Sequence, residues 1–195
     1  MRLFIALDID DAIRTRLSRF VEGVTGFAPD ARWVKPESLH VTLKFIGEQS
    51  DSAVDQIKET LSQVESSRSE IHFRSYGFFP TAKSARVFWI GMEADPQLAT
   101  LAAIIDDKMA SLGIPNEDRP FSPHLTLARA GSGSGSPRRN KTDRPNRVFH
   151  HLQEKLDPLP APEFGTMMAR AFLLYQSQLS PKGSKYTKLA SFDLK

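Results

Sequence analysis

The stretch HVTL at residues 40–43 is repeated almost unchanged as HLTL at residues 124–127. Each copy alternates polar and apolar residues, which is the pattern of a β-strand with one buried face. Successive side chains of a strand point to opposite faces, so the histidine and the threonine of each copy share one face. An imidazole beside a hydroxyl contributes little to a hydrophobic core. The pattern therefore predicts two strands that each present a polar, functional face.

The same alternation predicts which side chains anchor these strands. In the first copy Val41, Leu43 and Phe45 are expected to share the apolar face that points into the core. In the second copy Leu125 and Leu127 are expected to do the same. Both strands would then be held through one face and leave the histidine and the threonine on the other.

The composition is that of a chain that folds around its own hydrophobic core. Of its 195 residues 40% are hydrophobic and 25% are charged, and the net charge is +3. The absence of cysteine excludes disulfides, thiolate metal sites and thiol nucleophiles. The opening MRLFIALDIDD has no signal-peptide pattern, and no stretch approaches the roughly 20 apolar residues of a membrane span. We therefore expect a cytoplasmic protein with no membrane partner, and we expect a monomer.

Hydrophobic periodicity predicts strands and helices in an order that recurs along the chain. A strand, a helix, an HxTx strand and a second helix come first, and a similar order follows. The same motif at the same place in both halves indicates an internal duplication. A steady βαβ rhythm and a glycine-rich phosphate loop are both missing, so we expect an α+β fold with antiparallel sheets. The expected helices are about 11–24, 51–65, 96–112 and 146–156, and the expected strands are 3–9, 39–46, 71–79, 86–92, 124–129, 168–179 and 186–194.

A glycine- and serine-rich stretch, GSGSGS at residues 131–136, introduces a segment with an excess of positive charge. Between residues 131 and 151, five Lys and Arg residues stand against the single acid Asp143. Two interpretations are open for this flexible basic loop at about 131–147. It is either a loop insertion without a role or a mobile basic flap that lies over a polyanion.

Two histidines related by a duplication can face each other across a cleft. That geometry suits a reaction in which a proton is removed on one side and supplied on the other. Hydrolysis of a cyclic phosphodiester is such a reaction. One neutral imidazole would take a proton from the attacking water, and a protonated imidazole would give one to the departing ribose oxygen. The hydroxyls of Thr42 and Thr126 would donate hydrogen bonds to the non-bridging phosphate oxygens, and no metal is needed.

Other kinds of site fit the sequence less well. Two histidines without carboxylates or thiols at fixed spacing make a poor metal site, and the adjacent His150 and His151 do not supply the missing ligands. A serine hydrolase is disfavoured because the chain has no G-x-S-x-G elbow. A nucleotide- or RNA-binding module without activity remains open, although a pure binder has no need of two opposed proton-transfer groups.

Paired HxTx strands in a chain of this length resemble the 2H phosphoesterase superfamily. Within it the chain most closely resembles the LigT-like RNA 2′,3′-cyclic phosphodiesterases, once called 2′-5′ RNA ligases. The likeness is carried by MRLFIALDI at 1–9, RWVKPESLHVTLKFIGE at 32–48, FSPHLTLAR at 121–129 and LYQSQLSPKGSKYTKL at 174–189.

The resemblance implies one bilobal α+β domain over residues 1–195, with two antiparallel sheets flanked by helices and a central cleft that carries both motifs. It also implies hydrolysis of an RNA terminal 2′,3′-cyclic phosphate to a 2′-phosphate without a cofactor, with reversible 2′-5′ ligation. The expected partners are RNA ends or small nucleotides that carry a 2′,3′-cyclic phosphate. The motif reads the phosphate and not the rest of the ligand, so small cyclic phosphates remain open as substrates.

The likeness also implies roles for particular residues. His40 would be the general acid on the 3′ leaving oxygen and His124 the general base, with Thr42 and Thr126 on the phosphate. The near symmetry of the sequence does not itself choose which histidine takes which role.

Two further residues of the family pattern follow the motifs. Arg129 would line the cleft, but strict alternation places it opposite His124, so its strand must end or bulge before it. Phe45 is its counterpart after the first motif. Stacking of a terminal base and packing in the core are both open for Phe45.

Overall fold

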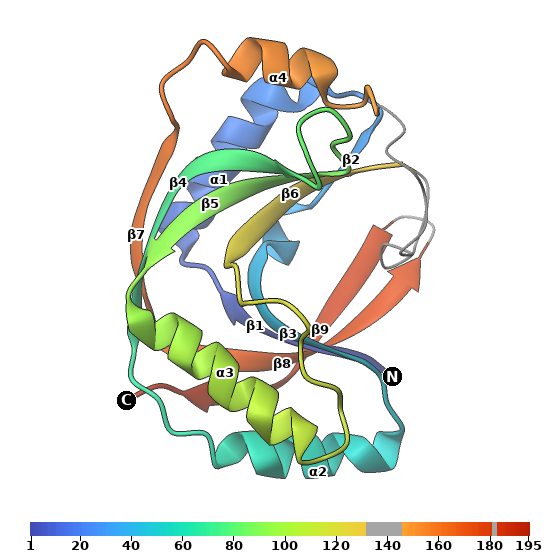
Figure 1. The fold of residues 1–195 in the computed structure, drawn as a ribbon, viewed down its shortest axis with the longest axis vertical. Coiled ribbons are helices and arrows are strands. Elements are labelled where there is room, and N and C mark those ends of the chain that lie inside the picture. Colours follow the sequence, from blue (N-terminus) through green and yellow to red (C-terminus); the bar gives the residue numbers. More distant parts are fainter. Residues whose placement is uncertain (132–145, 181–182) are drawn as a thin grey trace.

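Two antiparallel sheets dominate the computed structural model, which describes residues 1–131, 146–180 and 183–195 (Figure 1). The four-stranded sheet has the order β3-β1-β8-β9, formed by His40–Glu48, Arg2–Asp8, Ala171–Ser180 and Gly183–Asp193. The five-stranded sheet has the order β2-β6-β5-β4-β7, formed by Ala31–Trp33, His124–Ala130, Val87–Ala94, Ser69–Phe79 and Glu163–Ala169. The predicted α+β class with antiparallel sheets is confirmed. The predicted tether and most of the basic loop, residues 132–145, lie outside the described residues.

The helices divide between the two sheets. Helices α1 (Asp11–Val24) and α4 (His150–Leu156) lie with the five-stranded sheet, and α1 packs against β7 (Figure 1). Helices α2 (Asp51–Ser62) and α3 (Pro96–Ala110) lie along the four-stranded sheet, where α3 packs against β3. None of the helices in the described part of the chain is long and apolar enough to cross a membrane.

Each sheet contains strands from both halves of the chain. Strand β4 from the first half pairs with β7 from the second half, and β8 from the second half pairs with β1 from the first. A continuous hydrophobic core joins the two sheets, with buried residues from nearly every element. The halves therefore interlock, and neither sheet is complete without strands from both.

Long periodic segments were predicted well and short ones were not. Helix α1 begins and ends at the predicted residues, while α4 begins at His150 rather than near residue 146. Strands β2 and β7 were missed, and the predicted strand 168–179 is divided at Arg170 between β7 and β8. In β7 the buried residues are Phe164, Met167 and Ala169, so strict alternation fails near Gly165, which has φ 104°.

Candidate active site

The two motif histidines are held by the same hydrogen bond. His40 and His124 are the first residues of β3 and β6. The Nδ1 of His40 lies 2.8 Å from the Ser38 carbonyl oxygen, and the Nδ1 of His124 lies 2.9 Å from the Ser122 carbonyl oxygen. A carbonyl oxygen only accepts, so Nδ1 carries the hydrogen in both rings. Each Nε2 is then left to accept a proton when the ring is neutral or to donate one when it is charged.

A longer repeat in the sequence accounts for this shared geometry. Residues 36–43 read PESLHVTL and residues 120–127 read PFSPHLTL, so proline, serine, histidine, threonine and leucine recur at the same spacing. The repeated serine supplies the carbonyl that fixes each ring. This repeat extends the HxTx signal backward and indicates that the duplication includes the turns before the strands.

Aromatic rings surround both imidazoles. The His40 ring lies 4.8 Å from that of Phe4 and 5.2 Å from that of Tyr186, centroid to centroid. The His124 ring lies 5.1 Å from that of Phe79 and 6.2 Å from that of Trp89. This burial disfavours the charged imidazolium and is the main reason why the pKa of each histidine is lowered.

Arg129 connects the two histidines electrostatically. Burial has the largest effect on the pKa of both histidines, and the positive charge of Arg129 lowers the pKa of His40 and of His124 further. The charge of His124 also lowers the pKa of His40. Burial also lowers the pKa of Arg129, although part of its side chain reaches solvent, while the nearby Tyr186 hydroxyl acts in the opposite direction. His40 and Tyr186 belong to the four-stranded sheet, whereas Arg129 and His124 belong to the five-stranded sheet, and β3 contacts β6. The structure thus brings both motifs together where the sheets meet.

The motif threonines are available for a ligand. Thr42 and Thr126 are half-buried, and neither hydroxyl has a hydrogen-bond partner among the described residues. Neither hydroxyl is among the buried polar atoms that lack a partner, so each still reaches solvent and can exchange water for a ligand oxygen. Both hydroxyls can donate to an acceptor that lies between the strands.

A β-bulge follows each motif and moves the next residues to the other face. In the pairing of β1 with β3, Ile5 lies opposite Lys44 and Ala6 lies opposite Thr42, so that Leu43 has no partner. In the pairing of β5 with β6, Phe88 lies opposite Ala128 and Trp89 lies opposite Thr126, so that Leu127 likewise has no partner on β5. The predicted bulge before Arg129 is confirmed.

The bulge in β3 overturns one prediction. Phe45 was expected to share the buried face with Val41 and Leu43, and this is wrong: 57% of Phe45 is exposed, while Lys44 is buried. The Phe45 ring lies 6.2 Å from that of Phe4, which also contacts His40. Alternation could not reveal this because a bulge inserts an extra residue and inverts the pattern beyond it.

A pocket of about 600 Å³ lies against His40, with walls from β1, α1, β8, β9 and the turn before β3. Its lining includes the cations Lys35, Lys185 and Lys188 and the rings of Tyr175 and Tyr186. Its lining does not include His124. Burial, together with the charge of Asp8, raises the pKa of Tyr175 to about 12, so the phenol is neutral there.

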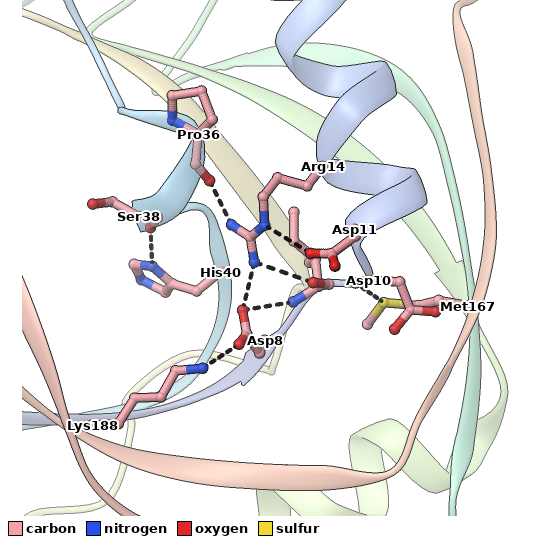
Figure 2. Close-up of polar contacts among 10 residues, drawn as sticks. Asp8, Asp10, Asp11, Arg14, Pro36, Ser38, His40, Met167 and Lys188 are labelled. Atoms are coloured by element: carbon pink, nitrogen blue, oxygen red, sulfur yellow. Dashed lines mark hydrogen bonds and ion pairs between the residues drawn. The ribbon is translucent and has the colours of Figure 1, made fainter.

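Three charged side chains that the sequence did not single out lie beside His40. Asp8, Arg14 and Lys188 form a network on one side of this histidine (Figure 2). Asp8 is the last residue of β1 and lies opposite His40, the first residue of β3. A prediction that these two strands pair would therefore have identified Asp8. Within residues 1–131, 146–180 and 183–195, no three His, Asp or Glu side chains are grouped so that they could hold a metal ion.

Comparisons with known proteins give the family and the fold of the chain. The family model described as LigT like Phosphoesterase matches twice, over residues 7–89 and 90–186. An RNA 2′,3′-cyclic phosphodiesterase of Archaeoglobus fulgidus is 35% identical over 193 residues, covering 99% of this chain and 100% of the relative. A crystal structure of a Thermus thermophilus protein has a TM-score of 0.78 and 27% identity, covering 99% of this chain and 97% of that one. The crystal structure of E. coli LigT complexed with 3′-AMP has a TM-score of 0.75 and 26% identity, with the same shares covered.

Proposed function

Since the chain belongs to the LigT-like phosphoesterase family, we propose that it is an RNA 2′,3′-cyclic phosphodiesterase that opens the cyclic phosphate to a 2′-phosphate. The observation that carries this proposal is the matched pair of histidines. Each has Nδ1 fixed on a backbone carbonyl and an Nε2 with no hydrogen-bond partner among the described residues, and the two come from contacting strands of different sheets. This arrangement supports one proton transfer on each side of a phosphorus atom.

The proposed reaction begins at the general base, which by family likeness is His124. Its neutral Nε2 takes a proton from a water molecule as the water oxygen forms a bond to phosphorus. The bond between phosphorus and the 3′-oxygen breaks on the opposite side. His40, in its protonated form, gives a proton from Nε2 to that oxygen, which leaves a 3′-hydroxyl and a 2′-phosphate. The same sequence of steps, with an RNA 5′-hydroxyl in place of water, forms a 2′-5′ linkage, and its reverse cleaves that linkage and restores the cyclic phosphate.

Thr42 and Thr126 are proposed to hold the phosphate. Their hydroxyls would donate to the non-bridging oxygens, where negative charge is held during the reaction. Arg129 would add a positive charge on the same face, and its electrostatic influence on both histidines supports this position. A cyclic phosphate between the two sheets would then meet donors from both motifs.

Phe45 is proposed to stack against the terminal base. Its exposed ring lies on the same side of β3 as His40 and Thr42 once the bulge is taken into account. Aromatic stacking is a common way to hold an unpaired RNA base and tolerates different bases. We further propose that the whole chain is one bilobal domain with the substrate cleft between the sheets, and that the basic loop at about 131–147 contacts longer RNA.

The proposal is tested with an oligonucleotide that ends in a 2′,3′-cyclic phosphate, incubated with the protein in excess EDTA. The expected product carries a 2′-phosphate, identified by its resistance to enzymes that require a free 2′-hydroxyl. Formation of a 3′-phosphate would reverse the proposed orientation of the ribose. Binding of the oligonucleotide without turnover would contradict the proposal and favour an RNA-binding module, whereas turnover of small cyclic phosphates alone would replace RNA as the substrate.

A further inference from the structure

The two histidines differ in what lies across the sheet from them. In the pairing of β1 with β3, Asp8 lies directly opposite His40. In the pairing of β5 with β6, the residue opposite His124 is Gly91, where an added Cβ would lie 2.8 Å from the Arg74 carbonyl oxygen. One histidine therefore has a carboxylate at its side, and the equivalent place beside the other has no room for a side chain.

Asp8 is held in its ionised form by a network of donors (Figure 2). Its Oδ1 accepts from the Arg14 guanidinium at 2.7 Å and from the Ile9 backbone N–H at 3.0 Å, and its Oδ2 accepts from the Lys188 ammonium. Burial opposes ionisation of Asp8, but Lys188 and Arg14 outweigh it and hold the pKa of Asp8 below its usual value. The carboxylate is thus negative across the range in which a histidine titrates.

Arg14 also holds the turn that precedes His40. Besides Asp8, its guanidinium donates to the carbonyl oxygens of Pro36 and of Ile9, the latter at 3.1 Å. Pro36 begins a 3₁₀ turn, Pro36–Ser38, and the Ser38 carbonyl at its end accepts the Nδ1–H of His40. Arg14 therefore fixes one end of the turn, and the other end orients the imidazole (Figure 2).

We propose that Asp8 and Arg14 are positioning residues for the reaction, which aim Nε2 of His40 and make His40, rather than His124, the histidine that delivers the proton. This inference rests on the proposed function for the identity of the reaction. The charged and titratable groups around His40 come from every element packed against it: Asp8 on β1, Asp11 and Arg14 on α1, Lys35 and Glu37 before β3, Tyr175 on β8, Lys185, Tyr186 and Lys188 on β9, and Arg129 and His124 on β6. Among the anions, Asp8 is the one whose charge raises the pKa of His40 and so favours the imidazolium.

Kinetics of matched variants test the positioning role. Asp8→Asn and Arg14→Gln are expected to lower kcat by about 10- to 100-fold, with little change in KM, because a misaimed group affects the chemical step. Asp8→Asn should also move the basic limb of the pH profile to lower pH, since the carboxylate no longer stabilises the imidazolium. Arg14→Lys should be impaired too, because one ammonium cannot reproduce the fork that reaches Asp8 and two carbonyls. The control is Arg16→Gln, which removes a guanidinium of the same helix that donates to the Phe164 carbonyl at 2.9 Å.

An NMR titration of the imidazoles separates this inference from the proposed function, because it needs no turnover. Asp8→Asn should lower the pKa of His40 and leave that of His124 unchanged. If Asp8→Asn does not fold, the kinetics of Arg14→Lys test the positioning role instead. If the wild type shows no turnover but Asp8→Asn still lowers the pKa of His40 alone, the proposed function is wrong, while the influence of Asp8 on His40 and not on His124 stands. Unchanged kcat in folded Asp8→Asn and Arg14→Lys, with an unchanged His40 titration, would overturn the inference.

Discussion

Phe45 and Arg129 occupy equivalent places in their strands, each five residues after its motif histidine and beyond a β-bulge. The bulge inverts the alternation of side chains, so both residues come to the face of the histidine and the threonine. One strand therefore presents an aromatic ring at this place and the other presents a guanidinium. A nucleotide offers a base to the first and a phosphate to the second.

Replacing Phe45 should affect binding and not folding. Phe45→Ala removes a ring that is 57% exposed, so the free energy of unfolding should change by about 0.5 kcal/mol or less. The KM for a cyclic-phosphate oligonucleotide should rise by about 5- to 100-fold, the loss expected for one stacked base. Urea unfolding and steady-state kinetics measure the two effects.

The matched control for Phe45 is Phe88, which is fully buried. Phe88→Ala should cost about 3–5 kcal/mol of stability. Equal destabilisation by the two replacements would contradict the exposed, ligand-facing position of Phe45.

The pH dependence should reflect two histidines that lose their protons readily. Burial and Arg129 lower both pKa values below the usual value for histidine, so each ring becomes neutral at lower pH than a free one. The profile of kcat/KM, which reports the free enzyme, should be a bell with both limbs below about pH 6.5. The limbs of kcat should lie higher, because the negative phosphate in the complex favours the imidazolium form.

Arg129→Gln tests the cause of this shift. Removing the guanidinium should raise the pKa of both histidines and move both limbs of kcat/KM to higher pH. Arg19→Gln, at an exposed position on α1, should leave the profile unchanged. A profile that is identical in the Arg129 variant and the wild type would exclude an electrostatic influence of Arg129 on the two histidines.

The motif threonines should matter through their hydroxyls alone. Thr42→Val and Thr126→Val keep the shape of the side chain and remove the donor, so each should lower kcat/KM by about 10- to 100-fold, the value of a hydrogen bond to a charged group. Stability should hardly fall, since neither hydroxyl has a partner in the described part of the chain. The control is Thr166→Val, at an exposed position of β7. If this control lowers kcat/KM as much as the motif variants do, the motif threonines make no specific contact with the phosphate.

A buried ion pair should stabilise the packing of β3 against α3 and against the segment that leads from α3 to β6. The Lys44 side chain is 1% exposed, and its ammonium donates to Asp106 on α3 and, at 2.9 Å, to the Pro115 carbonyl oxygen. Asp106→Ala leaves the ammonium buried and unpaired, so it should cost about 3–5 kcal/mol. The double variant Lys44→Met/Asp106→Ala should lose less free energy of unfolding than Asp106→Ala alone, as measured by urea unfolding. A larger loss in the double variant would show that the unpaired Lys44 charge is not the cause of the destabilisation.

The sequence was sufficient where a pattern is long or repeated. The apolar spacing of α1 and the paired HxTx strands predicted both their class and their position, because periodicity follows directly from which face is buried. Strand β2 has three residues, Ala31–Trp33, which is too short for any period to be recognised. Phe45 was misassigned because a bulge depends on the pairing of two strands and not on one strand alone.

The network beside His40 could not be predicted for a related reason. Asp8 and Lys188 are 180 residues apart, and they meet only because β1 and β9 belong to the same sheet. Arg14 reaches the turn before His40 from a helix, and nothing in its local sequence distinguishes it from Arg16. The role of the basic loop at 131–147 stays a prediction: affinity for long RNA should fall more steeply with salt than affinity for a dinucleotide.

The most direct measurement of the central claim is the turnover of a 2′,3′-cyclic-phosphate oligonucleotide by His40→Ala and His124→Ala, in excess EDTA. The control is His72→Ala, because His72 pairs with Glu163 on the surface of the five-stranded sheet. A proton-transfer pair predicts a loss of about 10²- to 10⁴-fold for each motif variant, with unchanged folding and a nearly wild-type control. Losses below about tenfold in both motif variants would contradict the paired-histidine account.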